Sequence, residues 1–460
     1  MNDSVARAVP QPAPYTSTRA FVKLAWPLFI ASLAVVGNST IDTVMAGRLS
    51  ANDLAAVAVG GSIYVSVFIG LMGVLQALSP IAGHHYGTQR WRAIGDDLQQ
   101  ALWLSIVLAL VGLPFLLATD TWVGFARVST EVATIATTYL HAIAFALPAA
   151  LASRAFVALN AAVSRPKITM MINVLALALK VPLNALFMSG AGPIPAMGGA
   201  GAGVATAVLA WVTLALSLGV WRLDPTFRRF RSERVHLPRW ANQRELLRLG
   251  IPIGLSVLFE VTSFTFMAVL IARLGTAAVA GHQVVANLAA ILFMVPLALG
   301  IATSVLIAQS LGAGHPRIAR VAALRGFRLA MSIAVIAAIG VWLLREPIVA
   351  LYTIDAAVSA VALSLIGWAA VFHVFDACQG VCGFALRGYK NTLWPMVIYG
   401  ISLWGVGLIG GYWIALFETP LGPPRGALGF WEAATVALGI AAIALTWLAA
   451  AVSSRRARHA

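Results

Sequence analysis

The sequence has few charged residues, and acidic ones are the scarcest. Asp, Glu, Lys and Arg make up 10% of the 460 residues, whereas apolar residues make up 60%. In a soluble domain, about 25% of the residues are charged and about 45–50% are apolar. A soluble chain of this length cannot cover so much apolar surface, because much of a soluble fold faces water. The composition therefore excludes an ordinary soluble protein and indicates a chain whose solvent is lipid.

Cysteine is also rare, and Cys378 and Cys382 are the only two. They share a helix face four residues apart, with no His or Cys cluster around them. This excludes a disulfide-rich secreted domain, and we expect the thiols to serve packing rather than metal or redox chemistry. Residues 1–20 are polar and contain proline, so we also expect no cleavable signal peptide.

Long apolar runs are what the sequence has in abundance. Each membrane crossing needs about 20 apolar residues. Every crossing should be a helix, because a lone strand leaves backbone groups unsatisfied in hydrocarbon. A hydropathy walk predicts twelve spans, near residues 21–46, 54–80, 98–118, 132–156, 168–189, 200–221, 247–272, 277–308, 325–344, 358–386, 393–417 and 430–451.

The net charge of +15 follows from this topology. Of the 31 Lys and Arg residues, 25 fall on one side of the predicted spans and five on the other. Cytoplasmic loops carry such an excess. We therefore expect a multi-pass protein of a bacterial inner membrane with both termini cytoplasmic. The basic charge indicates orientation, with some attraction to anionic lipid, and does not indicate a nucleic-acid partner.

The two halves of the chain are related in sequence. Because each predicted half has six spans, both begin on the same side, and the lobes are parallel repeats that can rock about a central cavity. The fold class is an all-α polytopic membrane protein with twelve transmembrane helices in a 6+6 pseudo-repeat. A shift of 225 residues places Pro27 on Pro252, Arg48 on Arg273, Gly87 on Gly312 and Arg92 on Arg317, and a shift of 223 places Lys167 on Lys390.

Five segments follow from this organisation. The segment between the lobes is the longest polar one and should form a basic cytoplasmic linker. The predicted boundaries are an N-terminal tail at 1–20, an N-lobe at 21–221, the linker at 222–246, a C-lobe at 247–451 and a C-terminal tail at 452–460.

Three acidic residues lie clearly inside predicted spans: Asp42, Glu260 and Asp376. An ionised carboxylate near the bilayer centre costs about 2.5–3.5 kcal/mol on insertion scales. Keeping all three acids therefore requires either contacts that offset this cost or a function that needs the carboxylates. A proton or cation site is the functional interpretation. Hydrogen bonding that serves only packing stays open for each, most of all for Asp42, which lies near the outer end of its span.

Glu260 and Asp376 are predicted to lie at similar depth. At about 1.5 Å per residue, both fall near the bilayer midplane and can face one cavity of the second lobe. Phe264 and Phe372 lie one turn from these acids and can each offer a ring to a cation. For each ring taken alone, core packing is the favoured interpretation.

Other polar residues also fall within spans. Lys180 is the only base deep in a span, and it can either snorkel or pair with Asp42. Asn38 lies one turn before Asp42 on the same face. His282, Gln283 and His373 are expected to be structural hydrogen-bonding residues, with a pore-lining role left open.

Four motifs resemble the multidrug and toxic compound extrusion (MATE) family, over nearly the whole chain, and the acids of the second half resemble its NorM-like branch. The motifs are Ile41-Asp-Thr-Val-Met-Ala-Gly-Arg48, Leu258-Phe-Glu-Val-Thr262, Ala280-Gly-His-Gln-Val284, and Asp376 followed by Leu386-Arg-Gly-Tyr-Lys390. The resemblance implies efflux of organic, mainly cationic amphipathic compounds driven by H⁺ or Na⁺. It also implies cation coupling at Glu260 and Asp376, with Na⁺ as a candidate ligand, and a first-lobe site at Asp42.

The chain departs from the family pattern at two positions. Phe372 stands where relatives commonly have Tyr, which keeps the ring and loses a hydroxyl. In Lys180-Val-Pro-Leu-Asn184 a lysine replaces an amide, and this puts a first-lobe Na⁺ site in doubt. Our hypothesis is that the Lys180 ammonium replaces the coupling cation beside Asp42 and leaves coupling mainly to the second lobe.

The sequence therefore predicts a secondary antiporter that works by alternating access and is not an enzyme. We expect no cofactor apart from the coupling ion, H⁺ or Na⁺. The expected partners are small organic cations and the bilayer, and the expected state is a monomer. A flippase for lipid-linked precursors is the alternative, but it would favour a basic cavity, whereas the central charges here are mainly acidic. A membrane-embedded enzyme is the least favoured, because no catalytic cluster or metal-binding motif is found.

Overall fold

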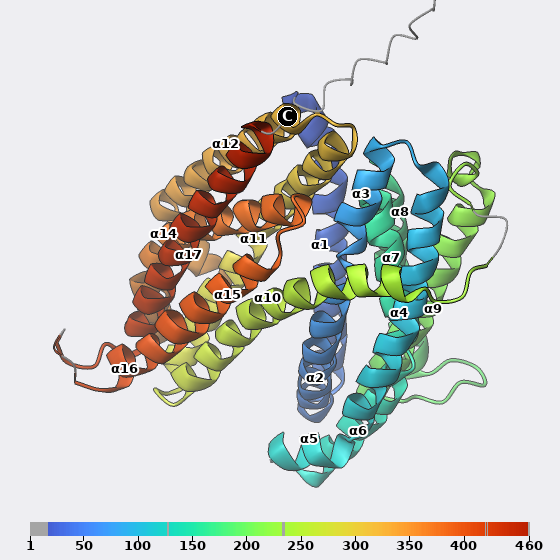
Figure 1. The fold of residues 1–460 in the computed structure, drawn as a ribbon. Helices are drawn as coiled ribbons and strands as arrows, with labels where there is room; N and C mark the ends of the chain where they lie inside the picture. Colours follow the sequence, from blue (N-terminus) through green and yellow to red (C-terminus); the bar gives the residue numbers. More distant parts are fainter. Residues whose placement is uncertain (1–16, 127, 232–234, 419, 421, 459–460) are drawn as a thin grey trace, which may run out of the picture.

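The computed structural model describes residues 17–126, 128–231, 235–418, 420 and 422–458, and the described chain is almost entirely helical. Its one β feature is an isolated bridge between Ala191 and Ile194. The helices form two lobes that diverge from the side where α1 begins and α17 ends (Figure 1). We call this side the terminal side and the other the opposite side.

The described part of the first lobe contains nine α-helices. Its elements are α1 (Thr18–Leu49), α2 (Ala51–Leu75), α3 (Leu78–Gly87), α4 (Trp91–Leu117), α5 (Thr119–Ala126), α6 (Thr130–Ala144), α7 (Leu147–Ala162), α8 (Pro166–Asn184), the π-helix η1 (Ala185–Ser189) and α9 (Gly199–Leu223).

The second lobe follows after the short 3₁₀ helix η2 (Pro225–Phe227). Its elements are α10 (Trp240–Ala272), α11 (Thr276–Gly312), α12 (Pro316–Leu343), α13 (Arg345–Tyr352), α14 (Ala356–Gly388), α15 (Leu393–Tyr399), the π-helix η3 (Gly400–Gly410), α16 (Gly411–Leu416) and α17 (Gly426–Arg458).

The predicted number of twelve spans agrees with these elements. Eleven helices of the described chain are long and apolar enough to cross a membrane, and the bent pair α6 and α7 makes the twelfth. The two helices of that pair meet at 48°. Pro148 lies just after the bend, and proline has no N–H to continue the hydrogen bonds of a helix.

The six membrane-spanning segments of one lobe correspond to the six of the other, which confirms the 6+6 architecture. Both lobes also contain a short helix that the hydropathy walk did not predict, α5 in the first and α13 in the second. Each has eight residues, which is too short to register as an apolar run. The lobes differ where α6 and α7 of the first correspond to the continuous α14 of the second.

The segment between the lobes packs more closely than its polar composition predicts. Phe227 and Phe230 are each 1% exposed and belong to the core of the first lobe. Gln100 donates a hydrogen bond to the carbonyl of Leu237 at 3.1 Å, and the Trp103 indole donates to the carbonyl of His236 at 3.0 Å. The described part of this segment is therefore held against α4.

The two lobes are in close contact where α3 packs against α11. A methyl group added to Gly87 would lie 2.1 Å from the carbonyl oxygen of Gln309, and one added to Gly312 would lie 2.1 Å from that of His84. The repeat shift of 225 relates Gly87 to Gly312 and His84 to Gln309. The contact is therefore nearly symmetric, and each glycine allows the partner backbone to approach.

Two polar links accompany this contact between the lobes. Gln309 Nε2 donates to the carbonyl of Ala162 at 2.7 Å and to Ser164 Oγ at 2.9 Å. The Arg387 guanidinium donates to Gln76 Oε1 at 3.0 Å. These hydrogen bonds join the ends of helices from opposite lobes, so they hold the described lobes together where they meet.

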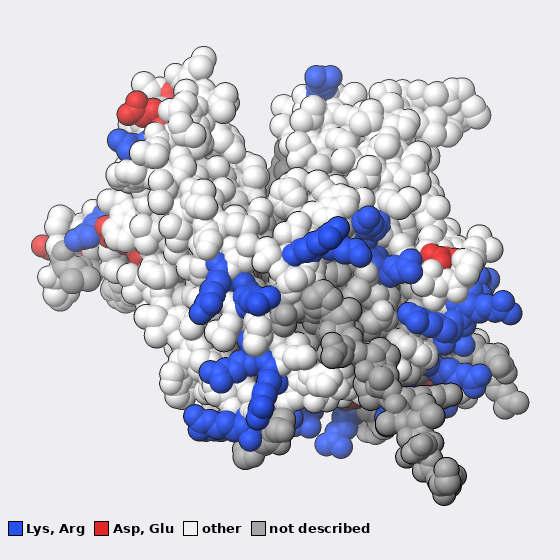
Figure 2. Space-filling model, turned by 90° about the horizontal axis from the view of Figure 1, so that it is seen from above, with Lys and Arg blue, Asp and Glu red and all other residues white. Residues whose placement is uncertain are grey.

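The basic side chains are distributed unevenly. Figure 2 views the molecule from the terminal side, and blue Lys and Arg side chains gather there with few red carboxylates between them. The last turn of α17 contributes Arg455, Arg456 and Arg458 to this end of the molecule. Basic residues at a helix C-terminus also complement its dipole, which favours the extension of α17 beyond the predicted end at 451.

Candidate functional site

Each lobe holds a cluster of polar side chains between its helices that contains acids from the predicted spans. The first-lobe cluster consists of Asp42, Lys180, Asn184 and Thr206. The second-lobe cluster consists of Glu260, Asp376 and Gln379. The two clusters contain every acidic residue predicted to lie deep in a span, and they differ in how those acids are neutralised.

The first-lobe cluster is built around a buried ion pair. Lys180 Nζ lies 2.8 Å from Asp42 Oδ1 and donates to Thr206 Oγ1 at 2.5 Å. Asn184 Nδ2 donates to the same Asp42 oxygen at 2.7 Å. The ammonium therefore has a carboxylate and a hydroxyl as ligands, and the carboxylate has two donors.

Helical spacing explains how these groups meet. Lys180 and Asn184 are four residues apart on α8, so they share the face that packs against α1. Lys180 is 1% exposed, and its ammonium does not snorkel toward either interface. Of the two alternatives left open for Lys180, snorkelling and pairing with Asp42, the structure shows the pairing. The pair carries no net charge, which lowers the cost of placing an acid and a base among apolar helices.

Asn38 does not join the first-lobe cluster. It lies one turn before Asp42 on α1 and is half-buried, and its Oδ1 has no hydrogen-bond partner among the described residues. Asn184 is fully buried, and its Oδ1 likewise has no partner within the described chain.

The second-lobe cluster joins two carboxylates through an amide. Gln379 Nε2 donates to Asp376 Oδ1 at 2.9 Å, and the Gln379 side chain also interacts electrostatically with Glu260. Glu260 comes from α10, whereas Asp376 and Gln379 are three residues apart on one face of α14. The structure therefore brings together the two acids that were predicted to lie at similar depth.

No ion pair neutralises these two acids. Within the described chain, neither Glu260 nor Asp376 has a Lys or Arg nitrogen within 4 Å. Arg387 interacts with Glu260 electrostatically. Its guanidinium, however, bonds to Gln76 and lies 4.3 Å from the centre of the Phe384 ring. The second lobe thus places two acids beside an amide that donates a hydrogen bond to Asp376.

An aromatic cluster lies beside the second-lobe acids. Phe264 and Phe372 meet edge to face with centroids 5.5 Å apart, and both also pack against Trp431 of α17. Their mutual packing supports the core interpretation of these two rings. Trp431 Nε1 donates to His282 Nδ1 at 3.2 Å, so His282 is a structural hydrogen-bond acceptor, as expected.

The other predicted polar positions have different environments. His373 is 2% exposed, and its Nδ1 has no partner in the described part of the chain. Gln283 is exposed on α11. Cys378 and Cys382 each place Sγ 3.4 Å from Thr446 Oγ1 of α17, as helix packing would.

Three members of these clusters escaped prediction: Gln379, Thr206 and Trp431. Gln379 had a detectable signal, because a polar residue three positions after a buried acid shares its face. Thr206 and Trp431 had none, because a lone hydroxyl or indole in an apolar run is common. Which helix each faces depends on tertiary packing.

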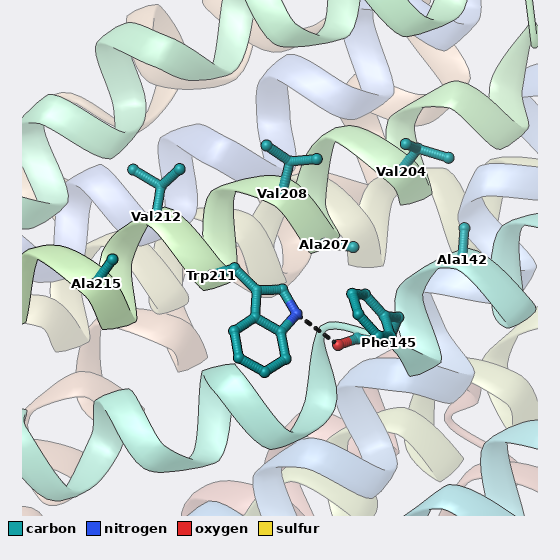
Figure 3. A pocket seen from close by; sticks show the side chains of 8 residues that line it. All are labelled: Ala142, Phe145, Val204, Ala207, Val208, Trp211, Val212 and Ala215. Atoms are coloured by element: carbon teal, nitrogen blue, oxygen red, sulfur yellow. Dashed lines mark hydrogen bonds between the residues drawn. The ribbon is translucent and has the colours of Figure 1, made fainter.

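One concave surface of the described chain is separate from both clusters. It has a volume of about 670 Å³ and is a groove between the end of α6 and α9. Figure 3 shows Val204, Val208 and Val212 along α9, with Trp211 donating to the Phe145 carbonyl at 3.1 Å. The groove is almost wholly apolar and carries no ionisable group, so it offers nothing to an ion or to a charged substrate.

Comparison with known proteins identifies relatives of the whole chain. The MatE family model matches residues 27–186 and 252–413, one stretch in each lobe. The probable multidrug resistance protein NorM of Aromatoleum aromaticum is 42% identical over 434 residues, covering 94% of this chain and 93% of that protein. The multidrug resistance protein NorM of Vibrio cholerae is 35% identical over 425 residues, covering 92% and 93%.

Solved structures show the same fold. The eukaryotic MATE transporter AtDTX14 superimposes with a TM-score of 0.86 at 18% identity, covering 96% of this chain and 98% of that one. An outward-facing multidrug resistance MATE family transporter superimposes with a TM-score of 0.86 at 17% identity, covering 95% and 96%.

Proposed function

The chain belongs to the MatE family and is a multidrug efflux transporter, not an enzyme, and on that premise we propose that it exchanges organic cations for H⁺ or Na⁺. One observation supports this proposal above all others. Glu260 and Asp376 lie together in the second lobe beside the Gln379 amide, which donates to Asp376, and neither acid has a basic ion-pair partner in the described chain. Two such acids can bind a monovalent cation or a proton in the membrane interior.

The distribution of basic residues supports an orientation for this transporter. Because the topology predicted from the sequence assigns 25 of the 31 Lys and Arg to the side of the termini, we infer that the terminal side faces the cytoplasm of a bacterial inner membrane. The close contact of Gly87 with Gln309 then closes the cytoplasmic side, and the diverging side faces outward. In the proposed alternating-access cycle, this contact must separate when the transporter opens inward.

The proposed exchange follows from electrostatics. Facing outward, Glu260 and Asp376 take up H⁺ or Na⁺, and this weakens their attraction for a cationic drug, which leaves. A membrane potential favours each inward charge by about 2.3 kcal/mol per 100 mV and opposes each outward cation equally. One-for-one exchange would therefore be electroneutral and driven by the ion gradient alone.

For the first lobe we propose a different role. The Lys180 ammonium, held by Asp42 and Thr206, replaces a coupling cation, so coupling rests mainly on the second lobe. Lys180→Asn should therefore add a second ion response that depends on Asp42. If transport by Lys180→Asn kept its ion dependence, and transport by Glu260→Gln did too, the hypothesis would be wrong.

The proposed partners are small organic cations and the surrounding bilayer, with one chain as the working unit. The test is ethidium transport by purified protein in proteoliposomes, with a Na⁺ gradient and a pH gradient imposed separately. We expect transport under at least one gradient and its loss in Glu260→Gln. Absence of transport under both, together with flipping of a lipid-linked precursor, would favour the flippase alternative.

A further inference from the structure

The Gln379 side chain is the link between the two acids of the second lobe. It is 1% exposed, and its Nε2 donates to Asp376 Oδ1 at 2.9 Å while the same side chain interacts electrostatically with Glu260. Since Glu260 is on α10 and Asp376 on α14, this one carboxamide lies between acids of two helices. It also brings together two groups that repel each other when both are ionised.

The oxygen of this carboxamide, Oε1, accepts no hydrogen bond from the described residues. A glutamine amide has two N–H donors and one carbonyl acceptor. Nε2 faces the carboxylate of Asp376, which only accepts when ionised, whereas Oε1 is buried and has no hydrogen-bond partner in the described chain. A buried acceptor without a partner is unfavourable, so Oε1 is available to a donor or a cation.

The surroundings of Gln379 limit what can supply that partner. The charged or titratable groups that interact with the acids here are Arg387 and the Tyr399 hydroxyl of α15. Arg387 is engaged with Gln76, and the Tyr399 hydroxyl donates to the main-chain carbonyl of Gln379 at 3.4 Å. Neither of these groups is seen to bond to Oε1.

We propose that Gln379 is a third ion-binding residue of the second lobe, whose Oε1 contacts the coupling ion when Glu260 and Asp376 bind it. A half-turn of the carboxamide exchanges Nε2 for Oε1, so an amide that holds the two carboxylates becomes a ligand. A carbonyl oxygen is a suitable ligand for Na⁺, and it can equally accept the hydrogen of a protonated carboxyl group. The inference rests on the proposed coupling role of the two acids and names the residue that completes their site.

The test compares Gln379→Met with Gln100→Met in the full-length protein. Methionine keeps the length and flexibility of glutamine but removes both its donor and its acceptor. Gln100 is a matched control, because it is also 1% exposed but bonds to the main chain at Leu237 and Arg239. The readout is thermal stability in detergent during a NaCl titration at ionic strength held constant with choline chloride, and in a parallel pH titration.

We expect Gln379→Met to need about tenfold or more of the effective ion, Na⁺ or H⁺, for half-maximal stabilisation, because a ligand to the ion is lost. Gln100→Met should lose stability without changing that midpoint. Gln379→Asn keeps a shortened amide, so its midpoint should lie between those of the wild type and Gln379→Met. It replaces Gln379→Met in the test if the methionine variant does not fold. Recovery of ion-dependent ethidium transport at high ion concentration by the same variants gives a second readout.

Glu260→Gln separates the two ways in which the inference can fail. If Glu260→Gln loses the ion response while Gln379→Met keeps the wild-type midpoint, Gln379 serves only to hold the helices together, and the inference is wrong. If Glu260→Gln also keeps the response, the proposed function of the acid pair fails, and the inference falls with it.

Discussion

The two lobes of this transporter contain the same succession of helices but neutralise their buried acids in opposite ways. In the first lobe Asp42 is bonded to Lys180 at 2.8 Å, so the charge is balanced from within. In the second lobe Glu260 and Asp376 share the amide of Gln379 and have no basic ion-pair partner in the described chain. Two lobes with the same arrangement of helices therefore differ in whether their acids are balanced by a base.

The difference is explained by where the charges lie in the repeat. Asp42 corresponds to Met267 and Glu260 to Val35 at the shift of 225, while Lys180 corresponds to Leu403 at the shift of 223. No charged residue of one cluster thus stands opposite a charged residue of the other. Asp376 corresponds to Ser153 at the shift of 223. Each lobe therefore has uncharged side chains where its counterpart has charges, and the two sites lie at different positions of equivalent helices.

Neutralising the second-lobe acids should have the largest effect. We expect Glu260→Gln and Asp376→Asn each to lower ion-driven ethidium efflux on the order of 100-fold, equivalent to about 2.7 kcal/mol of lost ion binding. The measurement is gradient-driven transport in proteoliposomes. The control is the double variant Asp42→Asn/Lys180→Met, which neutralises the first-lobe pair and should keep its ion dependence. Equal losses in both lobes would contradict the comparison.

Breaking the first-lobe ion pair on one side should destabilise the protein rather than uncouple it. Lys180→Met leaves the buried Asp42 carboxylate without its cation, and removing one partner of a buried pair costs about 3–5 kcal/mol. Thermal unfolding in detergent measures the loss. Adding Asp42→Asn to the same protein should recover most of it. A double variant as unstable as Lys180→Met would show that packing of the lysine stem, not charge, decides the effect.

Equivalent substitutions on the two sides of the contact between the lobes should have equal effects, whereas substitutions in the two charged clusters should not. Gly87→Ala and Gly312→Ala each place a methyl 2.1 Å from a carbonyl oxygen of the other lobe, so each should destabilise the closed contact by about 1–3 kcal/mol. Unfolding in detergent and the rate of transport report the change. Gly219→Ala of α9 is the matched control, because nothing lies within 4 Å of the added methyl. Unequal effects at Gly87 and Gly312 would argue against a symmetric contact.

The sequence predicts the architecture better than the sites, for a physical reason. Membrane spans follow from composition along the chain, which is why the twelve spans and the repeat agree with the helices. The acids stand out because a carboxylate in an apolar run is costly. Gln379 and Thr206 carry no such cost and become significant only when packing places them beside Asp376 and Lys180. The bend between α6 and α7 likewise depends on packing around Pro148.

The smallest expected effect concerns the hydroxyl that completes the first-lobe cluster. Thr206→Val removes the oxygen that accepts from Lys180 Nζ at 2.5 Å but preserves the shape of the side chain. The ammonium then keeps Asp42 but loses one ligand, so stability should fall by about 1 kcal/mol while ion dependence stays unchanged. Ser217→Ala on the same helix is the control, since its hydroxyl bonds only to the carbonyl of Thr213 at 2.8 Å. A Thr206→Val protein whose transport gained a new response to Na⁺ would show that the hydroxyl, and not only Lys180, excludes ions from the first lobe.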